Sequence, residues 1–215
     1  MGPSGSGKST LMFVLSSMDR VDGGQITFDK RELSMLSDNE LADLRRTGMG
    51  FVFQQPTLLS NLSILDNIIL PSMRDRRSDV ASIKERAAAL MERAGIDELA
   101  DRDITQASGG QLQRVGICRA LMNEPKVVFG DEPTGALNSR AADEIMHLLA
   151  EIHRTGTTIV LVTHDVRVAA RTQRVLFLFD GKIVGELEAG VCDGTSADLK
   201  DREERLTAWL ADKGF

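Results

Sequence analysis

Aromatic residues and cysteines are scarce in this sequence. Its 215 residues include no tyrosine, one tryptophan and two cysteines, Cys118 and Cys192. The cysteines have neither the paired spacing of a zinc site nor the density of a disulfide framework, which indicates a reducing compartment. Apolar runs such as residues 158–162 and 175–179 have only the length of strands, and neither end resembles a leader segment. We therefore expect a soluble chain that acts at a membrane only through a partner polypeptide.

An excess of positive charge is missing as well. The sequence has 26 Lys and Arg against 32 Asp and Glu, a formal net charge of -6. Surfaces that bind nucleic acid usually carry clustered Lys and Arg, so we expect no nucleic-acid partner. The hydrophobic content of 42% is enough for the core of one large domain or of a core domain with an inserted subdomain.

Apolar periodicity predicts an α/β fold. Helical spacing starts near Lys8 and recurs over residues 79–94, where Gly95 stands at the C-cap position. Continuous apolar strands at 127–129 and 158–162, joined through a helix, are typical of a parallel sheet covered by helices on both faces. The remaining predicted elements are strands at 25–28 and 49–53, a helix at 38–46, a hairpin over 175–187 and a helical tail at 199–210 whose Leu206 and Trp209 dock on the domain.

The opening segment Gly2–Ser9 satisfies the P-loop pattern. In such a loop, backbone N–H groups and a helix N-terminus surround phosphate oxygens. Lys8 would contact the terminal phosphates and Ser9 would ligate Mg²⁺. The alternative, a flexible Gly/Ser end, is disfavoured by the amphipathic helix that follows at once. The predicted nucleotide-binding residues here are Gly2, Pro3, Ser4, Gly5, Ser6, Gly7, Lys8, Ser9 and Thr10.

Two further segments carry groups suited to nucleotide chemistry. The predicted strand at 127–129 runs into Asp131 and Glu132, where Asp131 would hold Mg²⁺ and Glu132 would act as general base toward water. A strand followed by Asp-Glu is common in proteins and mostly structural. Here it indicates nucleotide chemistry because a P-loop precedes it. Ser108 is a natural N-cap before a helix, with Gly109 and Gly110 beside it. With Gln111, this segment predicts a second anion site.

In this order, the motifs resemble those of ABC ATPases, and residues 107–111 resemble their signature motif. The resemblance extends to about Leu187 and implies a P-loop NTPase, RecA-like core over 1–59 and 123–190, with a helical signature subdomain at 60–122. Residues 191–215 would form a tail helix of the same single domain, 1–215. The antiparallel subdomain that precedes the P-loop in the family is largely missing.

The resemblance also assigns roles to single residues. Gln54 matches the Q-loop glutamine, a metal ligand that links the nucleotide to the permease, with Gln55 as the weaker candidate. His164 matches the switch histidine. At the D-loop, Asn138 replaces the family's usual Asp, which puts communication across the dimer interface in doubt. His147 and His153 have no such match and are interpreted as ordinary helix residues.

Family members place a strand and an adenine-stacking aromatic residue before the P-loop, and neither stands before Met1 here. We interpret the start as a start codon assigned too late or a truncated product. The expected consequences are unpaired sheet edges, a P-loop without an anchor for its first glycine, and a tendency to aggregate.

The resemblance implies a transport ATPase that uses ATP and Mg²⁺. Segments such as 51–55, 67–71 and 131–137 are most similar to the MacB/LolD-type branch of exporters or extractors. The expected partners are a permease on a separate chain and a second copy of the ATPase, with the chain cytoplasmic and peripheral on the inner face of the cell membrane. The alternative is a truncated, noncatalytic module on a partner. We expect the segment 57–71 to receive the permease, through Leu58, Leu59, Leu62 and Ile64.

Overall fold

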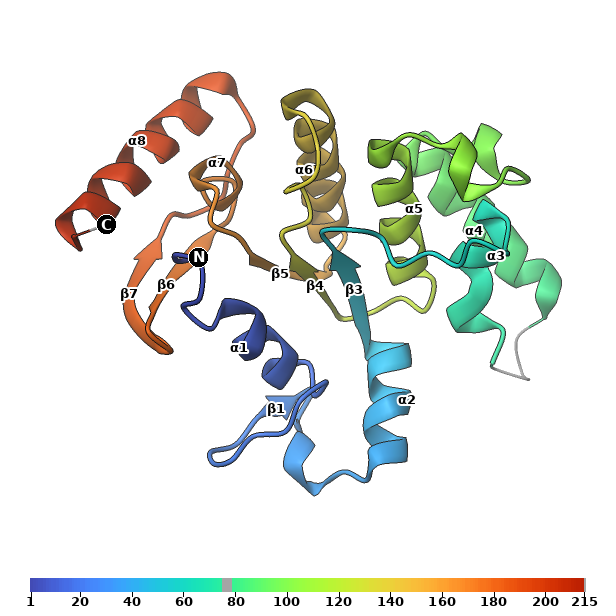
Figure 1. Cartoon of the computed structure of the whole chain (residues 1–215), viewed down its shortest axis with the longest axis horizontal. Coiled ribbons are helices and arrows are strands. Elements are labelled where there is room, and N and C mark those ends of the chain that lie inside the picture. Colours follow the sequence, from blue (N-terminus) through green and yellow to red (C-terminus); the bar gives the residue numbers. More distant parts are fainter. Residues whose placement is uncertain (75–78, 215) are drawn as a thin grey trace. The chain divides into compact units, whose positions relative to one another are not determined.

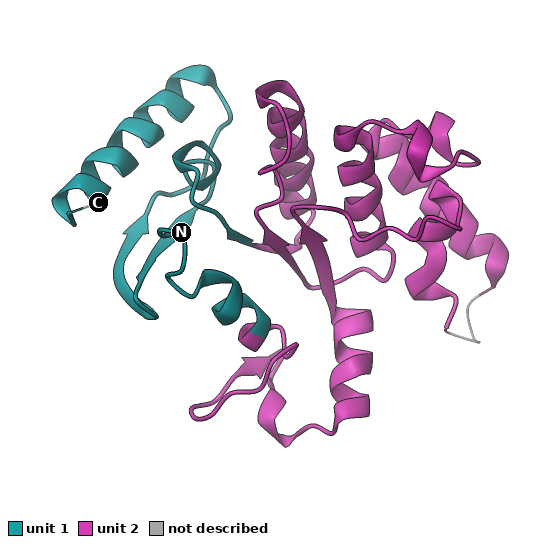
Figure 2. Cartoon of the chain, viewed as in Figure 1, with its two compact units in different colours: residues 1–13, 161–215 teal, residues 14–160 magenta. Residues whose placement is uncertain are grey.

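The computed structural model describes residues 1–74 and 79–214. It divides into two compact units, residues 1–13 with 161–215 and residues 14–160 (Figure 2). These two units differ from the core, signature subdomain and tail expected from the sequence, whose boundaries stay a prediction. The helices are α1 (Lys8–Leu15), α2 (Asp38–Gly48), α3 (Ile64–Ile69), α4 (Val80–Ala94), α5 (Gly109–Leu121), α6 (Ser139–Arg154), α7 (Val166–Ala169) and α8 (Ser196–Asp212), with short 3-10 turns at Leu33–Met35, Leu70–Ser72, Asp97–Leu99 and Ile104–Gln106. The strands are β1 (Thr27–Phe28), β2 (Arg31–Glu32), β3 (Met49–Phe53), β4 (Val127–Asp131), β5 (Thr158–Val162), β6 (Arg174–Phe179) and β7 (Lys182–Glu188).

A three-stranded sheet has the order β3-β4-β5 (Figure 1). Strands β3 and β4 run parallel, with Met49 paired to Val127 and Phe53 paired to Asp131. Helix α5 packs so closely on β3 that a Cβ atom at Gly50 would lie 2.7 Å from the carbonyl oxygen of Ala120. Glycine at this position therefore permits the helix to approach the strand. The predicted α/β class is confirmed, and β3 and β5 have the predicted bounds.

Helices α3, α4 and α5 gather around their own apolar core (Figure 1). Ile64, Ile68 and Ile96 are fully buried there. The predicted C-cap of α4 is confirmed, because Gly95 has φ 62° and donates to the carbonyls of the last turn. The expectation that Ile64 is exposed for partner docking is wrong, since an apolar residue at the first position of α3 is buried in this core instead.

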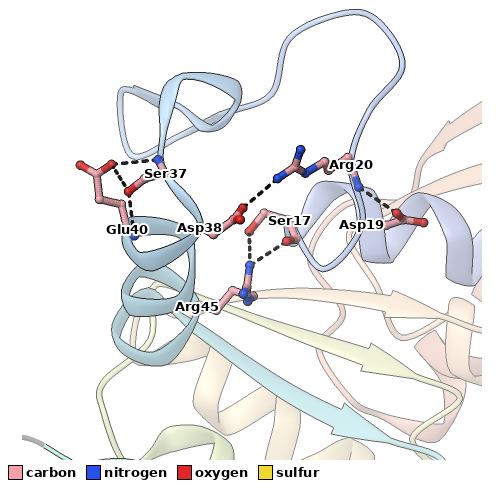
Figure 3. Close-up of polar contacts among 7 residues, drawn as sticks. All are labelled: Ser17, Asp19, Arg20, Ser37, Asp38, Glu40 and Arg45. Carbon is pink, nitrogen blue, oxygen red and sulfur yellow. Dashed lines mark hydrogen bonds and ion pairs between the residues drawn. The ribbon is translucent and has the colours of Figure 1, made fainter.

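The segment that ends α1 is bound to α2 through a partly buried backbone carbonyl. Ser17 has φ 56°, a left-handed conformation that ends the helix. The guanidinium of Arg45 donates to the Ser17 carbonyl at 2.7 Å and to its hydroxyl at 3.3 Å (Figure 3). Helix α2 begins with a capping box between Ser37 and Glu40, also drawn in Figure 3. Helix α2 then leads directly into β3, so these contacts fix where that strand begins.

Strands β6 and β7 form the predicted antiparallel hairpin, and α8 packs on it. The ring of Trp209 meets that of Phe177 edge to face, with centroids 6.2 Å apart. A Cβ atom at Gly185 would lie 2.8 Å from the Trp209 ring, so glycine leaves room for the indole. The predicted docking of Leu206 and Trp209 is confirmed. Within residues 1–74 and 79–214, no helix combines the length and the apolarity needed to cross a membrane.

Arg202 of α8 is only 4% exposed. Its guanidinium donates hydrogen bonds to backbone carbonyls of the two segments that flank the hairpin, at Ala170, Thr172, Ala189, Gly190 and Val191. Carbonyl oxygens left without donors in an apolar interior are costly. The arginine therefore binds α8 to the rest of its unit in addition to the apolar contacts.

We expect Arg202→Met to lower the free energy of unfolding by about 3 kcal/mol, because it leaves the buried Ala170 carbonyl and four partly buried carbonyls without this donor while preserving most of the side-chain volume. Chemical denaturation of the full-length protein measures this loss. Arg205→Met is the matched control on the same helix, since Arg205 is exposed and is expected to change stability by less than about 0.5 kcal/mol. Equal effects of the two substitutions would contradict the anchoring role of Arg202.

Candidate functional site

The P-loop is bound to the β6–β7 hairpin within its own unit. The terminal amino group of Met1 donates to the Leu176 carbonyl at 2.6 Å, and the Leu178 N–H donates to the Met1 carbonyl at 2.8 Å. The Gly181 N–H donates to the carbonyl of Ser6 at 3.0 Å. The expectation that the first glycine lacks an anchor is therefore wrong, because Met1 already bonds to β6 on both sides of its backbone.

The backbone of the P-loop requires glycine. A Cβ atom at Gly2 would lie 2.1 Å from the Leu178 carbonyl oxygen, so no other residue fits against β6. Gly5 and Gly7 have φ of 79° and 91°, conformations that side chains strongly disfavour. A Cβ atom at Gly5 would meet nothing within 4 Å, so this part of the loop is open to a ligand.

The P-loop residues fit a phosphate ligand. Among the described residues, the buried hydroxyl of Ser6 has no hydrogen-bond partner. A buried polar atom without a partner marks a place where a ligand or ion completes the bonding. The ammonium group of Lys8 donates to the Pro3 carbonyl at 2.8 Å and thereby stays at the loop, where α1 begins. The predicted helix start at Lys8 is confirmed, and its N-terminus favours an anion.

The carboxyl ends of β3 and β4 bring a second set of predicted residues together. The register pairs Phe53 with Asp131, so Gln54 and Glu132 follow directly on neighbouring strands. The Gly135 N–H donates to the Glu132 carbonyl at 2.9 Å and closes a turn. A Cβ atom at Gly135 would lie 3.0 Å from Nε2 of Gln54, so the glutamine packs on this turn. Gln54, Asp131 and Glu132 therefore lie at one edge of the sheet.

Glu132 has a strained backbone. Its φ of 47° lies in the left-handed region that glycine favours and that glutamate adopts less readily than Asn or Asp. Such strain persists only where the surrounding structure enforces it, and it concentrates at functional sites. The sequence carries no signal for this feature, because nothing in Asp131–Thr134 requires a positive φ.

Gln113 is a residue of this region that the motif analysis missed. Its side chain is 1% exposed, and its amide Nε2 donates to the carbonyls of Phe53 at 2.9 Å and Pro133 at 2.8 Å. The signal available in the sequence was a polar residue in the apolar stripe of α5, at helical spacing from Ile117 and Leu121. The spacing identifies a buried amide, but only the fold shows which carbonyls it reaches.

The predicted cap at Ser108 is confirmed. The Ser108 hydroxyl accepts from the Gln111 N–H at 3.3 Å, and the Gln111 side chain accepts from the Ser108 N–H at 2.8 Å. A Cβ atom at Gly110 would lie 3.3 Å from Ala141 of α6, while Ser108 and Gly109 are exposed. The N-terminus of α5 therefore faces solvent with its small residues, as an anion site requires.

The segments after β4 and β5 hold the remaining predicted residues. Asn138 is the N-cap of α6 and accepts from the Ala141 N–H at 2.9 Å, a role that Asp would fill equally well. His164 is exposed two residues beyond the end of β5. Beside it, hydrogen bonds from Arg167 hold the pKa of Asp165 below its usual range. His153 contacts the Thr157 carbonyl at 3.0 Å, in keeping with an ordinary helix residue.

The expected Mg²⁺ ligands are a hydroxyl, an amide and a carboxylate, from Ser9, Gln54 and Asp131. These oxygen donors suit a hard cation that keeps several waters. In the described part of the chain, no group of three or more His, Cys, Asp or Glu side chains is arranged to hold a metal ion. Ser9 belongs to one compact unit and the other two ligands to the second, so their joint role stays a prediction.

Comparison with known proteins agrees with this set of motifs. The sequence pattern of the ABC transporter family matches residues 1–135. A macrolide export ATP-binding/permease protein MacB from Hahella chejuensis is 44% identical over 218 residues, and one from Bordetella avium is 42% identical over 222 residues. These alignments cover 98% and 100% of this chain but 33% and 34% of the relatives, so the chain spans about a third of their length.

Solved structures give the same result at the level of the fold. The dimeric structure of MJ0796, a bacterial ABC transporter cassette, has a TM-score of 0.80 and 39% identity, with 88% of this chain and 83% of that chain covered. The structure of cbiO1 from Clostridium perfringens, part of the ABC transporter complex cbiONQ, has a TM-score of 0.80 and 30% identity, with 88% of this chain and 75% of that chain covered. A further MJ0796 structure is a dimer in a post-hydrolysis state with bound ADP and phosphate.

The strain at Glu132 predicts an order of stability among variants. We expect Glu132→Gly to be more stable than Glu132→Ala by about 1 kcal/mol, because only glycine adopts a positive φ without strain. Ala142→Gly in α6 is the control of opposite sign, since glycine lowers stability within a helix by about 1 kcal/mol. Denaturant unfolding of the full-length protein measures all three. A Glu132→Ala variant at least as stable as Glu132→Gly would show that the backbone there is relaxed.

Proposed function

The chain belongs to the ABC transporter family as an ATP-binding cassette, and we propose that it hydrolyses ATP to drive transport by a permease. The observation that carries the proposal is the P-loop, in which the buried, unpartnered hydroxyl of Ser6 lies in a glycine-rich loop at the N-terminus of α1. A phosphate would complete the bonding of this loop.

We propose a division of labour among the residues of the motifs. Lys8 binds the terminal phosphates, with backbone N–H groups from Gly2–Ser9 around them. Ser9, Asp131 and Gln54 hold Mg²⁺, which neutralises charge on the phosphate oxygens when it is bound. Glu132 accepts a proton from the attacking water, and His164 contacts the terminal phosphate. This role first requires Glu132 to lie within hydrogen-bond reach of the attacking water.

A second copy of the chain supplies the remaining contacts in this proposal. Ser108, Gly109, Gly110 and Gln111 begin α5 and would bind the ATP held by the partner's P-loop, because a helix N-terminus attracts an anion. Two-fold symmetry then makes two equivalent sites at one interface. The dimeric MJ0796 structures support this arrangement by similarity. Opening after hydrolysis would drive the permease.

The permease is the proposed membrane partner, and it would hold the chain at the inner face of the membrane. The related MacB proteins are named as macrolide export ATP-binding/permease proteins, which favours an export role of the MacB type. Their names join the two activities in one protein, so a permease on the same polypeptide is the alternative to the separate chain. The noncatalytic alternative is disfavoured, because Glu132 and His164 have no necessary function without hydrolysis.

Lys8→Ala and Glu132→Gln are expected to separate ATP binding from hydrolysis. Loss of the Lys8 ammonium weakens ATP binding itself, since it contacts phosphate before and during the reaction. Glu132→Gln preserves size and hydrogen bonding but cannot accept a proton, so turnover falls by about a hundred- to ten-thousand-fold while ATP still binds. Titration with a fluorescent ATP analogue and steady-state phosphate release measure the two effects in the full-length protein.

Glu151→Gln is the control, because Glu151 is exposed on α6 and lies outside the proposed machinery. With hydrolysis blocked, the Glu132→Gln protein should also shift to a dimer in size-exclusion chromatography when ATP is added. A Glu132→Gln protein that hydrolyses ATP at the parent rate would disprove the assigned role of the carboxylate.

The segment 57–71 is the proposed contact for the permease. Leu59 is 46% exposed, and the fully buried Asn67 fixes its backbone by accepting from the Leu59 N–H at 2.7 Å and donating to its carbonyl at 3.0 Å. We expect Leu59→Asp to abolish co-purification with the permease without changing the melting temperature. Val80→Asp is the matched control on α4, at 47% exposure. Unfolding caused by Leu59→Asp, or unchanged co-purification, would contradict the docking role.

A further inference from the structure

The buried amide of Gln113 lies between the two segments that carry the proposed catalytic chemistry. The two carbonyls that accept from Nε2 belong to Phe53, directly before Gln54, and to Pro133, directly after Glu132. The parallel pairing of β3 and β4 extends to Phe53 and Asp131. The amide thus bridges the last paired residue of β3 and the segment that follows β4, where the pairing of the two strands ends.

Further residues of α5 contact the segment that follows Gln54. A Cβ atom at Gly116 would lie 3.5 Å from Cβ of Pro56, and the guanidinium of Arg119 donates to the Thr57 carbonyl at 2.7 Å. Burial lowers the pKa of Arg119 from its usual value. Helix α5 therefore contacts the 53–57 segment at three successive points, with Gln113 at the end nearest the Ser108 cap.

The hydrogen bond from Gln113 to Pro133 also restrains the strained backbone of Glu132. A backbone held at φ 47° relaxes unless its neighbours prevent it. The Gly135 N–H holds the Glu132 carbonyl from one side of the turn, and Gln113 holds the adjoining Pro133 carbonyl from α5. An apolar side chain of the same volume would fill the space but would leave both carbonyls without this donor.

We propose that Gln113 is a positioning residue, which fixes Glu132 relative to Gln54 and so links the signature helix to hydrolysis. The proposal rests on the proposed function. An amide has two N–H groups, enough to bind both carbonyls at once. Displacement of a catalytic group by about 1 Å reduces turnover by about a hundredfold. The amide therefore acts on the rate of hydrolysis rather than on ATP binding, which is left to the P-loop.

Gln113→Met tests the proposal, because methionine is close in volume and has no donor. We expect kcat for ATP hydrolysis by the full-length protein to fall by about 10- to 100-fold, with KM within threefold of the parent value. Gln113→Asn keeps an amide on a side chain shorter by one methylene, and the same loss is expected because it cannot reach both carbonyls. Turnover is normalised to the folded fraction, and Gln113→Asn decides the question where the methionine variant does not fold.

Cys118→Ala is the matched control, on the same helix and also 1% exposed, with its thiol directed to the Leu90 carbonyl instead of the catalytic segments. Its kcat should stay within twofold of the parent value. A role in core packing alone predicts that folded Gln113 variants keep the parent kcat, and that result, or a raised KM at unchanged kcat, would overturn the proposal. Parent protein without ATP hydrolysis would instead overturn the proposed function.

Discussion

The parallel pairing of β3 with β4 is the constraint on which the chemistry of residues 14–160 depends. It places the ends of both strands at the same edge of the sheet, with Phe53 opposite Asp131. Gln54 and Glu132, which follow these strands, therefore lie at the same edge. Hydrogen bonds of the sheet stop at that edge, and the bonds that continue the order beyond it come from a side chain, Gln113 of α5. The segments that follow β3 and β4 are therefore held together in the same order as the strands.

Each of the two predicted anion sites lies at a helix N-terminus, but the two differ in local structure. The N-terminus of α1 is approached by a loop whose glycines are forced by contact with β6 and by positive φ. The N-terminus of α5 is closed by a reciprocal cap between Ser108 and Gln111, and small exposed residues leave access to it. Both leave partial positive charge available to a phosphate. In the proposed dimer, each P-loop would face the N-terminus of α5 in the other copy.

Much of the fold could be predicted from the sequence, because the signals were local. Strands β3 and β5 follow from continuous apolar runs, the start of α1 from the glycine-rich segment, and the end of α4 from Gly95. The features that were missed depend on contacts distant in sequence. Gln113 reaches Phe53 across 60 residues, and the positive φ of Glu132 is set by its surroundings. Ile64 was misjudged because exposure cannot be read from an apolar residue beside turns. The expectation of a P-loop without an anchor for its first glycine was wrong, because Met1 bonds to β6.

In the proposed function, the protein directs water to the terminal phosphate of ATP. Hydrolysis by the full-length protein in water enriched in ¹⁸O, followed by mass spectrometry of both products, measures this event directly. We expect Mg²⁺-dependent release of phosphate that carries ¹⁸O from water, with ADP that carries none. Label in ADP, or no product from folded protein that binds MgATP, would contradict it.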